Sequence, residues 1–215
     1  MSNEAFRPVR GIGTAAIILI IITTAIDIVN TVLDWTVGQV LVEYELGKAS
    51  ETAVTAAQAV LLMMLWVWLV AYVLAGITFM VWMYWARLNS HATASKHQHK
   101  WAPMWTIVGW LIPFVNLFVP FAVMQDIWRA SDRSQGTLAL QLRPKSTLVT
   151  AWWSCWIASF VLAYVGGRIQ LDFAVWSTFS TLATVAAAVL AIRIIRTLND
   201  AQHSVNEQNA SHAGA

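Results

Sequence analysis

The sequence predicts an all-α membrane protein with four transmembrane helices and a central re-entrant helical hairpin. Three observations predict this class: an apolar composition, long runs without charge, and a one-sided distribution of basic residues. Of the 215 residues, 58% are hydrophobic and only 11% are charged, whereas soluble domains carry about 25% charged residues. The 13 tryptophans are typical of membrane interfaces. The lipid bilayer is therefore the expected partner, and the net charge of +2 gives no indication of nucleic acid binding.

Runs without charged residues place the membrane segments, because a spanning helix needs about 20 apolar residues. Five such runs occur, at 11–26, 52–86, 101–125, 146–167 and 173–192. From them we expect transmembrane helices over about 11–34, 58–86, 146–167 and 173–195. The first begins like a signal peptide but lacks a convincing cleavage site, so we interpret it as a retained anchor. A single membrane domain is expected over residues 1–200, followed by a disordered cytoplasmic tail over 201–215.

Basic residues decide how the third run, 101–125, meets the membrane, because Lys and Arg concentrate on cytoplasmic loops. If all five runs cross, six basic residues lie on one side and seven on the other. If the third run enters and leaves on the same side, eleven lie inside and only Lys48 and Arg168 lie outside. This bias favours a re-entrant hairpin over 103–131, with both termini in the cytoplasm of a bacterial inner membrane. Five crossing helices are the alternative fold.

Prolines and an asparagine predict where the hairpin turns. Pro103 suits the first turn of a helix, and Pro113 ends that helix because it lacks an N–H and restricts the residue before it. Asn116 is expected to cap a second helix, with Pro120 close to its start. The first arm is roughly 15 Å long, about half of a hydrocarbon core. Because a broken helix at this depth leaves backbone groups unpaired, we expect the other four helices to wrap the turn.

The same region carries a long motif, which runs from "YWARLN" through "WTIVGWLIPFVNLFVPFAVMQDIWRAS" to "WWSCW". On these residues the chain resembles the bacterial membrane family called domain of unknown function 4328, over roughly residues 55–200. The matching positions are Arg87, Asn89, Trp110, Pro113, Asn116, Pro120, Met124, Trp128, Arg129, Ser131, Trp152 and Trp153. Members of the family often carry a basic residue before the second proline, where this chain has Val119. The family has no established activity, so the resemblance implies a membrane location but no mechanism.

Polar residues on the first helix form a candidate ion or ligand site. Thr23, Asp27, Asn30 and Asp34 recur at steps of four, three and four, which places them on one helical face. Ionisable residues in a membrane segment usually face the bundle interior and mark function. One interpretation is a cation or proton site with Arg168 as its partner. The other, simpler interpretation is a polar outer helix end that is hydrated or ion-paired.

Histidines offer a weaker candidate site. His91, His97 and His99 lie in one polar loop and are potential ligands of Zn²⁺ or Cu²⁺. The loop has no accompanying Cys or carboxylate, so we interpret it as a surface loop and expect no metal or other cofactor. A phosphate-binding glycine loop, a nucleophile elbow and an HExxH motif are all absent from the sequence.

No catalytic constellation appears, so we expect a non-enzymatic protein. The leading hypothesis is a scaffold or regulatory subunit that docks a membrane protein or further copies of itself at the cytoplasmic interface. Its docking region would be the second hairpin arm, anchored by Trp128 and Arg129. Trp152, Trp153 and Trp156 are expected to pack against the hairpin. The alternative is a small oligomeric transporter or channel that uses the hairpin and the polar stripe from Asp27 to Asp34.

Overall fold

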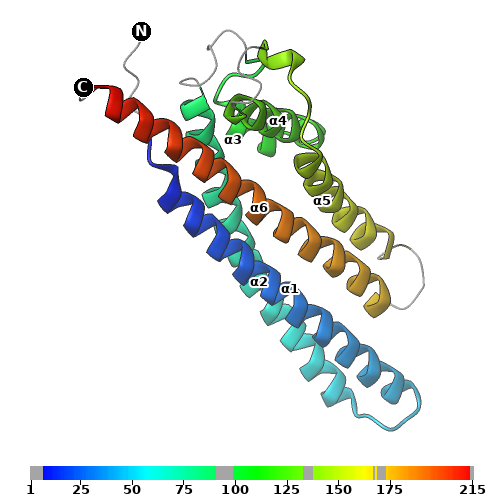
Figure 1. Cartoon of the computed structure of the whole chain (residues 1–215). Coiled ribbons are helices and arrows are strands. Elements are labelled where there is room, and N and C mark those ends of the chain that lie inside the picture. The colour runs from blue at the N-terminus through cyan, green and yellow to red at the C-terminus, as the bar shows by residue number, and fades with distance from the viewer. Residues whose placement is uncertain (1–6, 91–98, 133–137, 167, 169–172, 214–215) are drawn as a thin grey trace. The chain divides into compact units, whose positions relative to one another are not determined.

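A computed structural model shows helices throughout the part of the chain that it describes (Figure 1). It describes residues 7–90, 99–132, 138–166, 168 and 173–213, with side chains as far as Ser204. In chain order the helices are α1 (Val9–Glu45), α2 (Glu51–Asn89), α3 (Trp105–Leu111), the 3₁₀ turn η3 (Val115–Leu117), α4 (Val119–Ser131), the 3₁₀ turn η5 (Leu140–Leu142), α5 (Thr147–Gly166) and α6 (Phe173–Ala213). The predicted all-α class is confirmed.

Four of the described helices are long and apolar enough to cross a membrane, namely α1, α2, α5 and α6 as far as Ser204. The chain is therefore a multi-pass membrane protein, as predicted. α1 and α2 contain 37 and 39 residues and exceed their predicted spans. Polar residues beyond Asp34 do not break α1, which ends only where Gly47 adopts a φ of 68° and donates its N–H to the Tyr44 carbonyl at 2.9 Å. This is a glycine-terminated helix end.

Large apolar side chains face outward on these helices. Leu62, Met63, Trp66 and Val70 of α2 are each more than half exposed. Burying apolar surface away from water is worth about 25 cal/mol per Å², so such a face would be unfavourable in an aqueous protein. Hydrocarbon removes this penalty, which is why outward apolar faces suit a bilayer.

The structure divides into two compact units, and α1, α2, α5 and α6 each contribute to both. Unit 1 comprises Met1–Ile17, Gly76–Trp153 and Leu190–Ala215. Unit 2 comprises Ile18–Ala75 and Ser154–Val189. The core of unit 1 contains fully buried side chains from three helices: Trp82, Met83, Met124, Ile127 and Ile195.

α3 and α4 form a bent pair inside unit 1, with 119° between their axes. Gly109 lets the two helices approach closely, because a Cβ atom there would lie 3.0 Å from Val119 Cγ1. By length and composition the pair fits either a broken fifth span or a re-entrant loop.

The turn between α3 and α4 differs in detail from the sequence prediction. The predicted cap at Asn116 is wrong, because Asn116 lies inside η3 and donates its own N–H to the Ile112 carbonyl at 3.0 Å. Phe118 takes the N-cap position of α4 without a side-chain cap. Pro120 lies in the first turn of α4, as predicted. α3 begins at Trp105, two residues after Pro103.

The prediction that the other helices wrap this turn is also wrong. Phe114 is 82% exposed, and Leu111 and Phe118 are each 69% exposed. Local hydrogen bonds make wrapping unnecessary. The N–H groups of four successive residues, from 115 to 118, donate to carbonyls of residues 112 to 115. These backbone N–H groups are therefore paired within the turn itself, so they need no cover from other helices at membrane depth.

The C-terminal part of α6 continues as helix to Ala213, beyond residue 201, where the composition predicted a disordered tail. No proline occurs between Phe173 and Ala213. The helix therefore has no residue that must break it.

Candidate functional site

Arg87, the first residue of the motif, is 99% buried in unit 1. Its Nη2 donates to the Trp101 carbonyl at 2.7 Å, and its Nη1 donates to Ser90 Oγ at 3.1 Å. The side chain thus joins the end of α2 to the start of the segment that leads into α3. A guanidinium suits this position because it offers several donors in a fixed geometry.

Asn89 joins three separate parts of unit 1. Its Oδ1 accepts the Arg7 N–H at 3.0 Å, and its Nδ2 donates to the Arg7 carbonyl at 2.8 Å and to Gln202 Oε1 at 3.1 Å. Gln202 in turn donates to the Ala86 carbonyl at 2.9 Å. Buried amides pair fully here, so the residues leading into α1, the end of α2 and α6 are held together.

A second buried polar contact connects α2 with α6 in the same unit. Trp82 is fully buried and donates its indole N–H to Asn199 Oδ1 at 2.9 Å. α1 also approaches here, because a Cβ atom on Gly13 would lie 2.4 Å from Asn199 Nδ2. The glycine therefore leaves the space that the Asn199 amide occupies.

Aromatic rings connect the hairpin to α2 and α5. Trp110 lies 6.1 Å from Phe79 and 5.9 Å from Trp153, measured between ring centroids, and Trp152 lies 5.8 Å from Phe79. Trp153 also donates its indole N–H to the Leu117 carbonyl at 3.2 Å. The predicted packing against the hairpin is confirmed for Trp153. Trp152 packs on Phe79 of α2, and Trp156 packs on Phe160 of its own helix.

Two residues that are not among the matching motif positions hold α4 in place, Gln125 in the middle of the helix and Arg143 at its carbonyl end. Gln125 is almost fully buried, donates to the Ser146 carbonyl at 3.0 Å and accepts the Ser146 N–H at 2.8 Å. Arg143 donates to the Arg129 and Leu138 carbonyls at 2.7 and 3.1 Å. A cation at the carbonyl end of α4 also complements the helix dipole.

The remaining motif residues of α4 have packing or local roles. Met124 is fully buried, and Trp128 is half-buried. Arg129 lies 4.0 Å from Asp126, with its side chain only 13% exposed. Ser131 donates to the Ile127 carbonyl at 2.9 Å, within its own helix.

In unit 2, the polar face of α1 contacts α6 through side-chain hydrogen bonds. Ser177 donates to Asp34 Oδ2. The hydroxyls of Thr31 and Thr181 are hydrogen-bonded at 2.6 Å, and the Trp35 indole N–H donates to Thr178 Oγ1 at 2.9 Å. We call these three contacts the polar seam. It gives Asp34 a structural partner, although polar contacts of this kind are worth only about 0.6 kcal/mol on average in membranes.

The other members of the polar stripe also turn inward. Asp27 and Asn30 are half-buried, whereas Ile28 and Val29 between them are exposed. Arg168, the predicted partner, lies over the Tyr164 ring with its guanidinium carbon 5.1 Å from the centroid.

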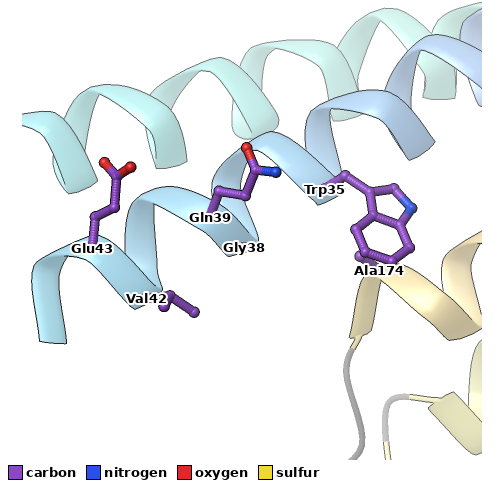
Figure 2. A pocket seen from close by; sticks show the side chains of 6 residues that line it. All are labelled: Trp35, Gly38, Gln39, Val42, Glu43 and Ala174. Carbon is purple, nitrogen blue, oxygen red and sulfur yellow. The ribbon is translucent and has the colours of Figure 1, made fainter. Parts of the chain in front are cut away.

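A cavity of about 400 Å³ adjoins the polar seam. Figure 2 shows its lining residues, which come from α1 and the start of α6: Trp35, Gly38, Gln39, Val42, Glu43 and Ala174. Trp35 belongs to both features, since its N–H is held by Thr178. Gln39 and Glu43 are exposed, so the cavity is an open hollow on α1.

The histidine loop lies mostly outside the described residues, which include only His99 of the three candidates. His99 Nε2 lies 3.4 Å from Ser90 Oγ. Among the described residues, no group of three or more His, Cys, Asp or Glu side chains is placed to hold a metal ion.

Sequence reasoning missed several residues that carry the architecture. Gln125, Arg143, Asn199 and Gln202 are buried and make long-range hydrogen bonds. For Gln125, Asn199 and Gln202 a signal was present, because uncharged amides beside apolar helical runs need partners when buried. The hydroxyl-rich start of α6, "WSTFSTLAT", likewise indicates a helix contact in a membrane.

Comparison with known proteins gives one match. The family model described as domain of unknown function (DUF4328) matches residues 47–200. This range begins after α1 and includes every motif position named above. No curated protein and no solved structure matches the chain.

Proposed function

The chain belongs to the DUF4328 family, and from this premise we propose that it is a non-enzymatic scaffold or regulatory subunit of the bacterial inner membrane. It would dock a membrane-protein partner at the cytoplasmic interface. The proposal concerns the role of unit 1, in which the motif residues lie.

The roles of the motif side chains carry the proposal. Arg87, Asn89 and Trp153 direct their donors to backbone carbonyls or to a buried amide. Trp110 and Trp152 pack against other rings. Groups with such partners hold helix ends and the hairpin in place. A rigid junction is what a docking platform requires, because pre-organisation lowers the entropy lost on binding.

Charge supports a cytoplasmic position for unit 1. Of its residues whose side chains are described, nine are basic and three are acidic: Arg7, Arg10, Arg87, Lys100, Arg129, Arg143, Lys145, Arg193 and Arg196, against Asp126, Asp132 and Asp200. Unit 2 has the opposite balance, with five acidic and two basic residues: Asp27, Asp34, Glu43, Glu45 and Glu51, against Lys48 and Arg168. Basic residues remain on the cytoplasmic side during insertion. Both described chain ends belong to unit 1, so both termini would be cytoplasmic.

The arrangement around the hairpin supports re-entry. Arg87 near the end of α2 interacts electrostatically with Asp126 of α4. The neighbouring residue Gln125 is hydrogen-bonded to Ser146, which directly precedes α5. The end of α2 and the start of α5 therefore both lie beside adjacent residues of α4 within unit 1. A fifth crossing would place the end of α2 and the start of α5 on opposite sides of the membrane, about 30 Å of hydrocarbon apart.

Trp128 on α4 is the residue through which to test docking. The chain would be purified in mild detergent after photo-crosslinking in membranes, and the partner would be quantified per chain. Trp128→Ala should abolish stoichiometric recovery of the partner. Trp66→Ala should leave recovery unchanged, because Trp66 is 63% exposed on the unit 2 part of α2. Equal recovery with both variants, or recovery of the chain alone, would reject the scaffold.

The cavity on α1 favours a second candidate, a small oligomeric transporter. Glu43 and Gln39 would offer polar contacts to a cation beside Trp35. Flux into proteoliposomes that Glu43→Gln abolishes, in a protein of unchanged thermal stability, would replace the scaffold proposal with this one.

A further inference from the structure

We propose that the tip of the hairpin, residues 111–118, is a lipid-binding surface that inserts among the acyl chains of one leaflet with anionic headgroups. The inference rests on the re-entrant hairpin of the proposed function, and it adds that lipid is what the tip of that hairpin contacts. The occupant is lipid rather than a second copy of the chain, for three reasons that follow.

First, every exposed side chain of the tip is apolar. The exposed residues are Leu111, Ile112, Pro113, Phe114, Leu117 and Phe118. Asn116, the one strongly polar residue of the tip, is half-buried, and its Oδ1 atom is covered by protein. A surface facing water or an aqueous pore would mix polar and apolar groups, whereas hydrocarbon favours a wholly apolar one.

Second, the backbone of the tip needs no partner from a second chain. The Val115 N–H donates to the Pro113 carbonyl at 2.8 Å, which closes a three-residue turn around Phe114. Phe114 has a φ of 65°, which is the positive φ that the central residue of a γ-turn of this hand requires. Pro113 and Pro120 have no N–H, and Trp153 donates to the Leu117 carbonyl. The N–H groups of residues 115–118 are therefore paired within the chain, and the unpaired Oδ1 atom of Asn116 is covered by protein, where a second copy could not reach it.

Third, the base of the hairpin carries exposed lysines and half-buried tryptophans. Lys100 lies 5.6 Å from the centroid of the Trp101 ring, which packs on Trp105 at 5.3 Å. Lys145 is also exposed and precedes Ser146, which is bonded to Gln125 of α4. Indoles and cations together mark the headgroup level of a leaflet, and Lys attracts anionic lipid.

The length of α3 limits the depth of insertion. Its seven residues extend about 10 Å at 1.5 Å per residue, less than half of a hydrocarbon core of about 30 Å. A tip held at this distance from the Trp101 level reaches the acyl chains of one leaflet and stops before the other.

Depth-dependent fluorescence quenching tests this placement. Phe114→Cys in a Cys155→Ser background would carry a bimane label, and Lys100→Cys would carry the same label as the control at the base. The protein would be reconstituted in phosphatidylcholine–phosphatidylglycerol vesicles. Quenching by lipid brominated on its acyl chains should exceed quenching by iodide about threefold at 114. At 100 the order should reverse. Phe118→Cys would provide a second reporter of the tip.

Two outcomes would overturn the insertion: stronger quenching by iodide at 114, or shielding of 114 from both quenchers, as a second copy would produce. The headgroup is tested separately by placing the bromine on phosphatidylglycerol or on phosphatidylcholine at equal content. Stronger quenching by brominated phosphatidylglycerol is expected, and equal quenching would refute the anionic preference. The docking proposal is tested separately, through Trp128→Ala. If that variant still recovers the partner, the scaffold proposal fails, but the quenching results at residues 114 and 100 still decide whether the tip inserts into lipid.

Discussion

Gly13 lies where α1 packs against α6, and replacing it tests the close contact in unit 1. A Cβ atom at this position would lie 2.4 Å from Asn199 Nδ2, so Asn199 must move in Gly13→Ala. Asn199 Oδ1 accepts the indole N–H of Trp82, which is fully buried. Movement of the amide therefore breaks a buried hydrogen bond and leaves a donor unpaired.

The expected magnitude follows from opposing terms. An unpaired buried donor costs about 1–3 kcal/mol. Alanine in place of glycine within a helix contributes up to about 1 kcal/mol in the other direction. The free energy of unfolding of Gly13→Ala should therefore fall by about 0–2 kcal/mol, which is the cost of the unpaired donor less the full gain from alanine.

Gly11 provides the matched control, two residues away in the same helix. It is exposed, and a Cβ atom there would meet nothing within 4 Å. Gly11→Ala should leave the free energy of unfolding unchanged or raise it by up to about 1 kcal/mol. Both variants would be measured by sodium dodecyl sulfate titration in mixed micelles, followed by circular dichroism. Equal stability of the two variants would refute the packing described for α1.

Three further predictions concern the hairpin and its supports. Phe114→Gly should raise the free energy of unfolding by about 1 kcal/mol in the same titration, because glycine adopts a positive φ without the strain of a side chain; a lower stability would contradict this. Arg143→Lys should lower it by about 2 kcal/mol, because an ammonium cannot reproduce the fork of donors that reaches two carbonyls; an unchanged value would show that the carbonyls need only a charge. Cysteines replacing Lys100 and Lys145 in a Cys155→Ser background should both react with an impermeant maleimide from the cytoplasmic face, and reaction from opposite faces would establish a fifth crossing.

The elements that depend on composition could be predicted from the sequence. Uncharged runs place the four spans because exclusion of charge from hydrocarbon is a strong and local requirement. The bend near Pro113 follows from the missing N–H of proline, which acts on the residues beside it. The segment 105–131 is accordingly a bent helical pair in both the prediction and the structure.

Features that depend on pairing between distant residues could not be predicted. Asn116 has the chemistry of a helix cap, but the choice between capping and a 3₁₀ turn depends on the bond from its N–H to Ile112. From the sequence, Asp34 is a potential ion ligand. Its hydrogen-bond donor, Ser177, lies 143 residues away in the chain, so the sequence does not indicate the pair. The expected wrapping of the turn failed because the pairing of N–H groups inside it is a matter of backbone geometry. Helix ends also ran further than charge suggested, since polar residues outside hydrocarbon do not stop a helix.

The polar seam has a consequence for how α1 and α6 can move within unit 2. Its partners are Thr31 with Thr181, Asp34 with Ser177 and Trp35 with Thr178, and they lie within about one turn of each helix. A small axial slide would part all three pairs at once. Displacement by a full turn would be needed before side chains could meet again. The polar seam therefore resists gradual sliding of α1 along α6 and permits movement only in discrete steps.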